Sequence, residues 1–171
     1  ILYRNNSCDL QLNKNDIDNI NFQDYSAVFI SGTALSSNPS RDAVFYATQK
    51  ASSLSIPLII DMDYRPYNWE SDEIKSNIYK KIMNEMDIII GNDLEFNIAD
   101  NSTKGFQLAK SFINEKPSII IYKMGEKGST VITKEKEQNF GIFKVEAIKP
   151  TGAGDAFNGG FISSIIQGYS P

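Results

Sequence analysis

The chain has 171 residues, a formal net charge of −4 and a single cysteine, with ordinary fractions of apolar and charged residues. This length suffices for one globular domain with a hydrophobic core, which we expect to cover residues 1–171. The negative charge argues against a nucleic-acid partner, which would require a basic face. One cysteine cannot form an internal disulfide and favours a reducing cytoplasm. No apolar run approaches the ~20 residues that span a bilayer, so no membrane partner is expected.

Short apolar runs alternate with stretches of helical periodicity along the chain. The runs predict buried strands, and apolar residues three and four positions apart predict amphipathic helices. Ser40 and Ser71 are the expected N-caps of two of these helices. In chain order the sequence predicts a strand over 27–32, a helix over 40–54, a strand over 57–61, a helix over 71–86, a strand over 87–91, a helix over 104–112, a strand over 118–122, an antiparallel pair over 128–133 and 140–147, and a helix over 153–167.

This alternation predicts an α/β fold, a Rossmann-like three-layer α/β/α core in which a mainly parallel sheet is covered by helices on both faces. The charged stretch 134–138 is expected to be the solvated tip of a hairpin. In such sheets ligands bind beyond the carboxyl ends of the strands. The candidate site residues are therefore the polar residues that follow the strands, at 31–33, 61–69, 91–95 and 123–128.

A turn with two glycines opens the last predicted helix, in the stretch Thr151-Gly152-Ala153-Gly154-Asp155. The first turn of such a helix presents unpaired backbone N–H groups and the positive end of the helix dipole, which suit a phosphate. An aspartate beside that phosphate is placed to take a proton from an attacking hydroxyl. Two alternatives are a plain strand-to-helix connection with a capping aspartate and a dinucleotide-binding loop. The dinucleotide loop lacks its third glycine, because the chain has phenylalanine at that position.

Three motifs, in the expected order, resemble those of one enzyme family. Residues 151–157, Thr-Gly-Ala-Gly-Asp-Ala-Phe, are similar to the C-terminal signature of the PfkB-type, or ribokinase-like, carbohydrate kinases. Residues 92–95, Asn-Asp-Leu-Glu, resemble that family's N-x-x-E motif, and residues 123–128 resemble the strand and turn that flank its nucleotide. The resemblance covers essentially the whole chain. It implies a ribokinase-like fold whose N-terminal part, with the substrate lid, and whose C-terminal end are missing from this chain.

The resemblance implies a phosphoryl transfer from ATP to a sugar hydroxyl at the glycine turn. Asp155 is the expected base, which takes the proton of the hydroxyl as it attacks the γ-phosphate. The backbone N–H groups of Gly152, Ala153 and Gly154 are expected to stabilise the charge on the transferring group. The helix dipole is expected to keep the Asp155 side chain ionised.

The other two motifs imply the contacts with nucleotide and magnesium. Asn92, Lys123, Gly125 and Gly128 are expected to bind ATP. Asn92 and Glu95 are expected to hold Mg²⁺ through water, because two side chains are too few for a closed metal cage. Simpler alternatives stay open: Asn92 and Glu95 as a polar cap of the following helix, and Lys123 as a solvent-facing charge at a strand end.

Further segments resemble a branch of this family that phosphorylates keto-deoxy sugar acids. The preferred match is to the kinases of 5-dehydro-2-deoxygluconate, which act in inositol breakdown, and 2-keto-3-deoxygluconate kinases are the alternative. A non-catalytic sugar or nucleotide sensor is the alternative of another class, because fold alone does not determine function. The segments that carry this resemblance are residues 2–6, 31–35, 39–43 and 61–69.

Both sugar acids carry a carboxylate, which requires a cationic partner. Arg4 and Arg65 offer planar guanidinium groups for it, and their simpler alternatives are a strand-edge charge and a surface arginine beside Trp69. Lys149 is a departure, because many ribokinase-like enzymes carry there an aspartate linked to a monovalent-cation site. Potassium activation through this residue is therefore not expected. A homo-oligomer stays open, because the lid that usually mediates pairing in this family is not in the chain.

Overall fold

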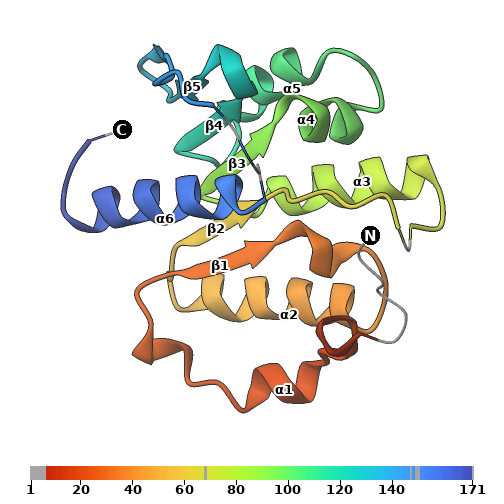
Figure 1. The fold of residues 1–171 in the computed structure, drawn as a ribbon. Helices are drawn as coiled ribbons and strands as arrows, with labels where there is room; N and C mark the ends of the chain where they lie inside the picture. The colour runs from red at the N-terminus through yellow and green to blue at the C-terminus, as the bar shows by residue number, and fades with distance from the viewer. Residues whose placement is uncertain (1–6, 68, 147, 149–150, 171) are drawn as a thin grey trace.

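The computed structural model of the protein describes residues 7–67, 69–146, 148 and 151–170. Its centre is a six-stranded sheet in the order β1-β2-β3-β4-β5-β6 (Figure 1). The first four strands are parallel, and β5 and β6 extend the sheet as antiparallel strands beside β4. The strands are β1 (Val28–Ser31), β2 (Leu58–Asp61), β3 (Ile88–Asn92), β4 (Ile119–Lys123), β5 (Ser129–Ile132) and β6 (Glu137–Phe140).

One face of the sheet carries most of the helices. Ile60, Ile89 and Ile120 of this face belong to one buried cluster with side chains of α2, α3, α4 and α5. Parallel strands that follow one another in sheet order, with right-handed crossovers, place their connecting helices on the same face. The helices are α1 (Lys14–Asp18), α2 (Ser40–Ser53), α3 (Asp72–Met83), α4 (Asp93–Asp100), α5 (Gly105–Phe112) and α6 (Ala153–Ile166), and short 3₁₀ turns are η1 (Cys8–Gln11), η2 (Phe22–Asp24), η3 (Gly32–Leu35) and η4 (Gly125–Lys127).

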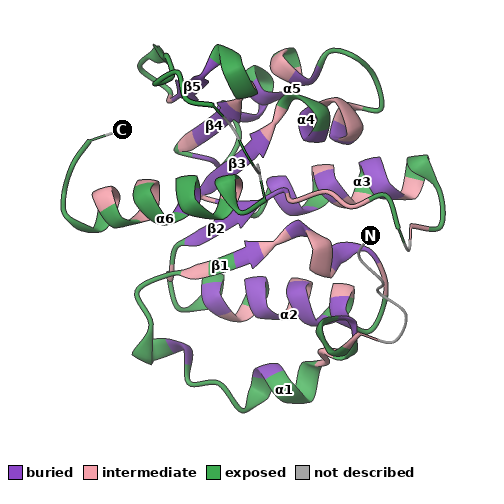
Figure 2. Ribbon diagram, in the orientation of Figure 1, coloured by how far each residue is buried: buried purple, intermediate pink, exposed green. Residues whose placement is uncertain are grey.

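The opposite face is covered by α6. Phe161 and Ile162 of α6 pack against a second cluster that includes Ile90 and Ile121. Figure 2 shows the central strands as buried, whereas much of α6 is exposed. Phe29 of β1 remains 46% exposed on this side. The fold is therefore a three-layer α/β/α core with a mainly parallel sheet, which confirms the predicted class. None of the described helices is both long and apolar enough to cross a bilayer.

The helix predictions are correct in type, with differences at the ends. Ser71 is the N-cap of α3, and its side chain accepts a hydrogen bond from the backbone of Ile74 at 3.1 Å. The N-cap prediction for Ser40 is wrong, because Ser40 is already helical and its hydroxyl donates to the carbonyl of Ala34. Helix α4 was given no bounds from the sequence, and it entered only as the helix that Asn92 and Glu95 could cap.

The second strand of the antiparallel pair lies earlier than predicted. It covers Glu137–Phe140 and not 140–147, and it begins within the stretch 134–138 that was interpreted as the hairpin tip. Ile132 pairs with Glu137, so the hairpin closes over the short turn between β5 and β6, and Ser129 pairs with Phe140 at its open end. All four residues of β6 are exposed. An edge strand of this kind tolerates charged and polar residues, which is why its composition resembles that of a loop.

Candidate active site

A pocket of about 420 Å³ lies where β3 and β4 end and α6 begins. The pocket collects segments that are far apart in the chain, because the carboxyl ends of parallel strands meet at one edge of the sheet. Six residues predicted to contact nucleotide or phosphate line it together, and four neighbours complete the lining. The six are Asn92, Lys123, Gly125, Gly128, Ala153 and Gly154, and the neighbours are Ser129, Gly141, Ile142 and Phe157.

The first turn of α6 forms one wall of this pocket. Gly152 precedes the helix as its N-cap, with a left-handed φ of 85° that glycine adopts without strain. Glycine has no side chain that could accept a hydrogen bond from the first turn. The N–H groups at the start of the helix are therefore left for another partner, and the helix dipole makes that end positive. This wall suits an anion, in agreement with the prediction from the glycine turn.

Asp155 lies on the same turn but lines a different, smaller pocket of about 230 Å³. Phe29 of β1 and Asn158 of α6 are among the other residues that line it. The Asp155 side chain is exposed. Asp155 and the anion-binding wall therefore share one helical turn, and a group that reached Asp155 would enter from the side of β1.

Lys123 ends β4 and contributes the cation of the 420 Å³ pocket. Its side chain is 17% exposed, and its Nζ lies 3.5 Å from Asp61 Oδ1 and 5.8 Å from the centre of the Phe157 ring. A Cβ atom on Gly154 would be 3.8 Å from this Nζ. The alternative of a solvent-facing lysine is therefore wrong, because Lys123 is largely covered and lies against the first turn of α6.

Asn92 and Glu95 form the capping box of α4. Asn92 Oδ1 accepts from Glu95 N at 2.9 Å, and the Glu95 oxygens accept from Asn92 N at 2.7 Å and from Tyr64 N at 3.0 Å. Burial raises the pKa of the Glu95 carboxyl, an effect that the donated N–H of Asn92 opposes. The cap interpretation of this pair is thus correct in structure, and the cap leaves Asn92 in the pocket lining.

The described residues contain no cluster of three or more acidic, histidine or cysteine side chains that could hold a metal ion. Both oxygens of Glu95 already accept backbone N–H groups. Direct ligation by Glu95 would compete with the cap of α4. The residues present therefore fit magnesium only through water molecules, which Mg²⁺ commonly retains when it also binds phosphate oxygens.

Arg65 lies after β2 and is held by neighbouring groups. Its Nη2 is 2.6 Å from Asp63 Oδ1, and its Nη1 donates to the Tyr64 carbonyl at 2.9 Å. Asp63 Oδ2 in turn accepts from Ser31 Oγ at 2.8 Å, which links the ends of β1 and β2. The guanidinium is partly exposed and retains further N–H donors. Arg4, the other predicted carboxylate partner, lies outside the described residues, as does Lys149.

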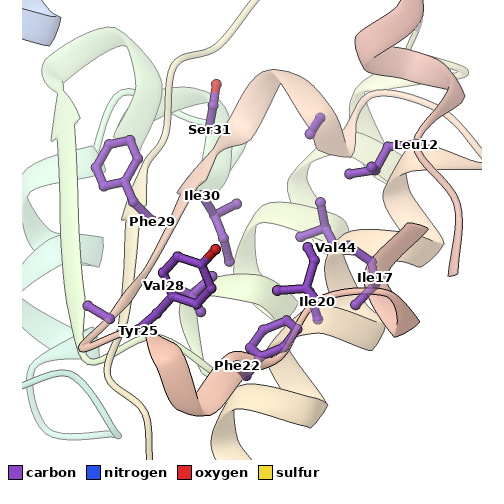
Figure 3. Close-up of a pocket in the computed structure, with 13 residues that line it drawn as sticks. Leu12, Ile17, Ile20, Phe22, Tyr25, Val28, Phe29, Ile30, Ser31 and Val44 are labelled. Atoms are coloured by element: carbon purple, nitrogen blue, oxygen red, sulfur yellow. The ribbon is translucent and has the colours of Figure 1, made fainter. Parts of the chain in front are cut away.

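A third pocket, of about 370 Å³, is of a different kind. Figure 3 shows apolar side chains of β1, α1 and α2, among them Ile30, Ile17 and Val44, facing one another across it. None of the described residues that line this pocket carries a charged side chain. It therefore does not suit a phosphate or a sugar acid, and the polar edge of the sheet stays the candidate site.

Two site residues were missed by sequence reasoning. Asn158 Nδ2 donates to Asp61 Oδ2 at 2.6 Å in a buried contact. Asp61 belonged to the polar stretch 61–69 but was given no role. Asn158 lies inside a helix, and nothing in the local pattern separated it from its neighbours. The closeness of Asp61 to Lys123 is likewise a product of strand order and not of local sequence.

Comparison with known proteins identifies the family. The family model described as pfkB family carbohydrate kinase matches residues 1–171. The chain belongs to the pfkB family. The 5-dehydro-2-deoxygluconokinase of Photobacterium profundum is 36% identical over 174 residues, which is 98% of this chain and 53% of that protein. The corresponding kinase of Clostridium perfringens is 37% identical over 175 residues, which is 99% of this chain and 52% of that protein.

Solved structures of pfkB-related proteins share the fold. The PfkB protein from Polaromonas sp. JS666 gives a TM-score of 0.83 at 18% identity and covers 94% of this chain and 53% of that chain. A putative ribokinase II from E. coli, in complex with ATP and Mg²⁺, gives a TM-score of 0.76 at 21% identity. That match covers 87% of this chain and 48% of that chain. Because the sequence identities are low, these structural similarities establish only the fold. The chain spans about half the length of the curated pfkB relatives that it matches.

Proposed function

We propose that the protein containing this chain is an ATP-dependent kinase that phosphorylates the primary hydroxyl of a sugar acid. The substrate oxygen forms a bond to the γ-phosphorus of ATP, and the bond from that phosphorus to the bridging oxygen breaks. ADP leaves with that electron pair, and Asp155 takes the proton of the hydroxyl and later releases it to solvent. Residues 1–171 would form a single kinase core that supplies the phosphate-binding side of the reaction.

The observation that carries this proposal is the 420 Å³ pocket. It gathers Lys123, Asn92 and the first turn of α6 from distant parts of the chain. The N–H groups contributed by Gly152, Ala153 and Gly154 would stabilise the charge that develops on the transferring group. Phosphoryl transfer depends mainly on such positioning and electrostatic stabilisation, so a cationic, glycine-lined pocket beside a free aspartate fits it.

Nucleotide and magnesium would share the same pocket. Lys123, Asn92 and the glycines of η4, Gly125 and Gly128, would lie against the phosphates of ATP. Bound Mg²⁺ would neutralise phosphate charge. Asn92 and Glu95 would hold its water molecules, because the oxygens of Glu95 already serve the cap of α4.

The proposed acceptor is 5-dehydro-2-deoxy-D-gluconate, which would become its 6-phosphate. Two observations support a sugar acid. The relatives that match the chain over nearly its full length are named 5-dehydro-2-deoxygluconokinases. Arg65 also lies at the polar edge of the sheet with N–H donors to spare, and a guanidinium binds a carboxylate in a bidentate manner. The alternative acceptor, 2-keto-3-deoxygluconate, carries the same carboxylate.

A substrate panel tests this proposal. Coupled ADP release by the full-length protein, with ATP and Mg²⁺, is measured on both keto-deoxy sugar acids and on ribose and fructose. We expect the highest kcat/KM on 5-dehydro-2-deoxygluconate. Preference for a neutral sugar would support the kinase activity but contradict the proposal that the acceptor is a sugar acid. Binding of ATP and sugar without ADP release on any acceptor would favour a sensor and contradict the kinase.

Replacement of Arg65 by methionine tests how the acid is recognised. We expect the KM for the sugar acid to rise about 10-fold or more, since charge-assisted hydrogen bonds contribute about 1.5–3 kcal/mol each. The KM for ATP is the internal control and should stay within twofold, because Arg65 does not line the phosphate pocket. An equal rise of both KM values would instead indicate that the Arg65 guanidinium only supports the local fold, through its contacts with Asp63 and the Tyr64 carbonyl.

A further inference from the structure

A buried polar cluster lies between the ends of two strands and α6. Asp61 ends β2, Lys123 ends β4, and Asn158 lies in α6, three residues after Asp155. Asp61 is 7% exposed and Asn158 is 4% exposed. A buried carboxylate is unfavourable unless it is paired and hydrogen-bonded, so each contact of Asp61 matters for how this region is arranged.

The carboxylate of Asp61 divides its two oxygens between the two partners. Oδ2 accepts a hydrogen bond from Asn158 Nδ2 at 2.6 Å. Oδ1 lies 3.5 Å from Lys123 Nζ, which is ion-pair distance without hydrogen-bond geometry. One side chain thus joins the cation of the 420 Å³ pocket to the helix that carries Asp155.

Neither contact is explained well by stability alone. Buried ion pairs contribute little net stability, because the desolvation of the charges offsets their attraction. The cluster also leaves Asp61 Oδ1 and Asn158 Oδ1 buried without a hydrogen-bond donor among the described residues. Unsatisfied polar atoms of this kind are costly, and they concentrate where a structure serves a function. The geometry instead holds Lys123 and the first turn of α6 in one fixed relation.

We propose that Asp61 is a positioning residue for the phosphoryl transfer. Its carboxylate orients the ammonium group of Lys123 toward the anion pocket and keeps the first turn of α6 in register with that ammonium. This inference rests on the proposed function, because it assigns Asp61 a role in that reaction. A misplacement of about 1 Å in a reacting constellation lowers the rate about 10²-fold, so loss of this link should affect turnover strongly.

The test is Asp61→Asn in the full-length protein. Asparagine has the same shape and retains an oxygen for the Asn158 amide, but it presents no charge to Lys123. We expect kcat to fall about 30-fold or more, while the KM for the sugar acid stays within about twofold. A purely structural role would lower the midpoint of thermal unfolding without this split between kcat and KM.

Asp87→Asn is the matched control. Asp87 lies at the other end of the parallel strands, where its Oδ2 accepts from Leu58 N at 2.8 Å and its Oδ1 lies 3.6 Å from Lys116 Nζ. Like Asp61, it therefore pairs one oxygen with an N–H donor and the other with a lysine, but it has no contact with the site. We expect Asp87→Asn to change stability and leave kcat unchanged. An equal loss of kcat in both variants would overturn the proposal.

The double variant Asp61→Asn with Asn158→Asp keeps the test informative if the single variant does not fold. It restores an amide–carboxylate hydrogen bond with the two groups exchanged. We expect stability to recover and kcat to stay low, because the carboxylate no longer comes from β2. Recovery of kcat would overturn the role of Asp61. Wild-type kcat in Asp61→Asn would reject this inference alone, whereas a wild-type protein inactive on every acceptor would reject the proposed function with it.

Discussion

Replacement of Asp155 by asparagine in the full-length protein is expected to lower kcat about 10³-fold, within the range of about 10²–10⁴ that a general base contributes. Asparagine has nearly the same shape as aspartate but cannot accept the proton of the attacking hydroxyl. Asp155 lies on the first turn of α6, exposed beside a pocket of about 230 Å³ into which a hydroxyl could reach. Single-turnover kinetics with ATP and the sugar acid would measure the chemical step directly.

Affinity for ATP should change little in Asp155→Asn, and calorimetric titration with a non-hydrolysable analogue checks this. The N–H groups of the first turn belong to the backbone and are unaffected by the substitution. A variant that lost nucleotide affinity and turnover together would indicate that Asp155 supports the anion site and is not the base.

Asp42→Asn controls for effects on the helix. Asp42 is the third residue of α2, and Asp155 is the third residue of α6; both helices have 14 residues, and both aspartates are exposed. Removal of either charge weakens the interaction with the helix dipole by about 0.3–1 kcal/mol. We expect Asp42→Asn to show only this small loss of stability, with unchanged kcat. A wild-type kcat in the Asp155→Asn variant would contradict the assignment of Asp155 as the general base.

The elements that bound the phosphate pocket could be predicted from the sequence because their signals are local. The turn before α6 requires a glycine at its left-handed residue, and the helix ends before Gly168, whose φ is 84°. The central parallel strands β2, β3 and β4 are isoleucine-rich runs that are buried on both faces. Strand order then brings Asn92, Lys123 and the glycine turn to one edge of the sheet, as the rule for parallel sheets predicts.

The polar cluster beneath α6 could not be predicted in this way. Asp61 and Asn158 are 97 positions apart, and their contact depends on how α6 crosses the sheet. The ion pair between Asp63 and Arg65 was missed for a related reason. Asp63 is also held by the Ser31 hydroxyl, which comes from another strand. The edge strand β6 was predicted too late in the chain, at 140–147, because an exposed strand needs no apolar pattern. Local signals thus identified the elements, while tertiary packing decided which side chains share a partner.

Substitution of Gly128 by alanine is expected to destabilise the fold strongly, and the same substitution at Gly125 is its matched control. Both glycines line the phosphate pocket, and both have positive φ values, 87° at Gly128 and 56° at Gly125. Their surroundings differ. A Cβ atom on Gly128 would overlap the backbone carbonyl of Phe140, whereas a Cβ atom on Gly125 would meet nothing within 4 Å. The two positions therefore separate a loss of fold from a loss of ligand contact.

Gly128→Ala is expected to lower the free energy of unfolding by about 3 kcal/mol or more, because backbone strain of about 1–3 kcal/mol adds to the steric overlap. The ψ of Gly128 is −142°, a combination with positive φ that is essentially restricted to glycine. The overlap falls on the backbone where the end of β6 pairs with the start of β5, and Gly128 O also accepts from Met124 N at 2.8 Å. Relief of the clash would have to separate this hairpin.

Gly125→Ala is expected to cost only about 1–2 kcal/mol, the usual penalty for a left-handed residue other than glycine. Urea unfolding of both variants, followed by circular dichroism, measures the difference. Titration of the folded Gly125→Ala variant with a non-hydrolysable ATP analogue then reports on the pocket itself, because the added methyl group projects into open space. Equal stability of the two variants would contradict the close approach of Phe140 to Gly128. A Gly125→Ala variant with unchanged affinity would show that the phosphates lie against the α6 side of the pocket and not against η4.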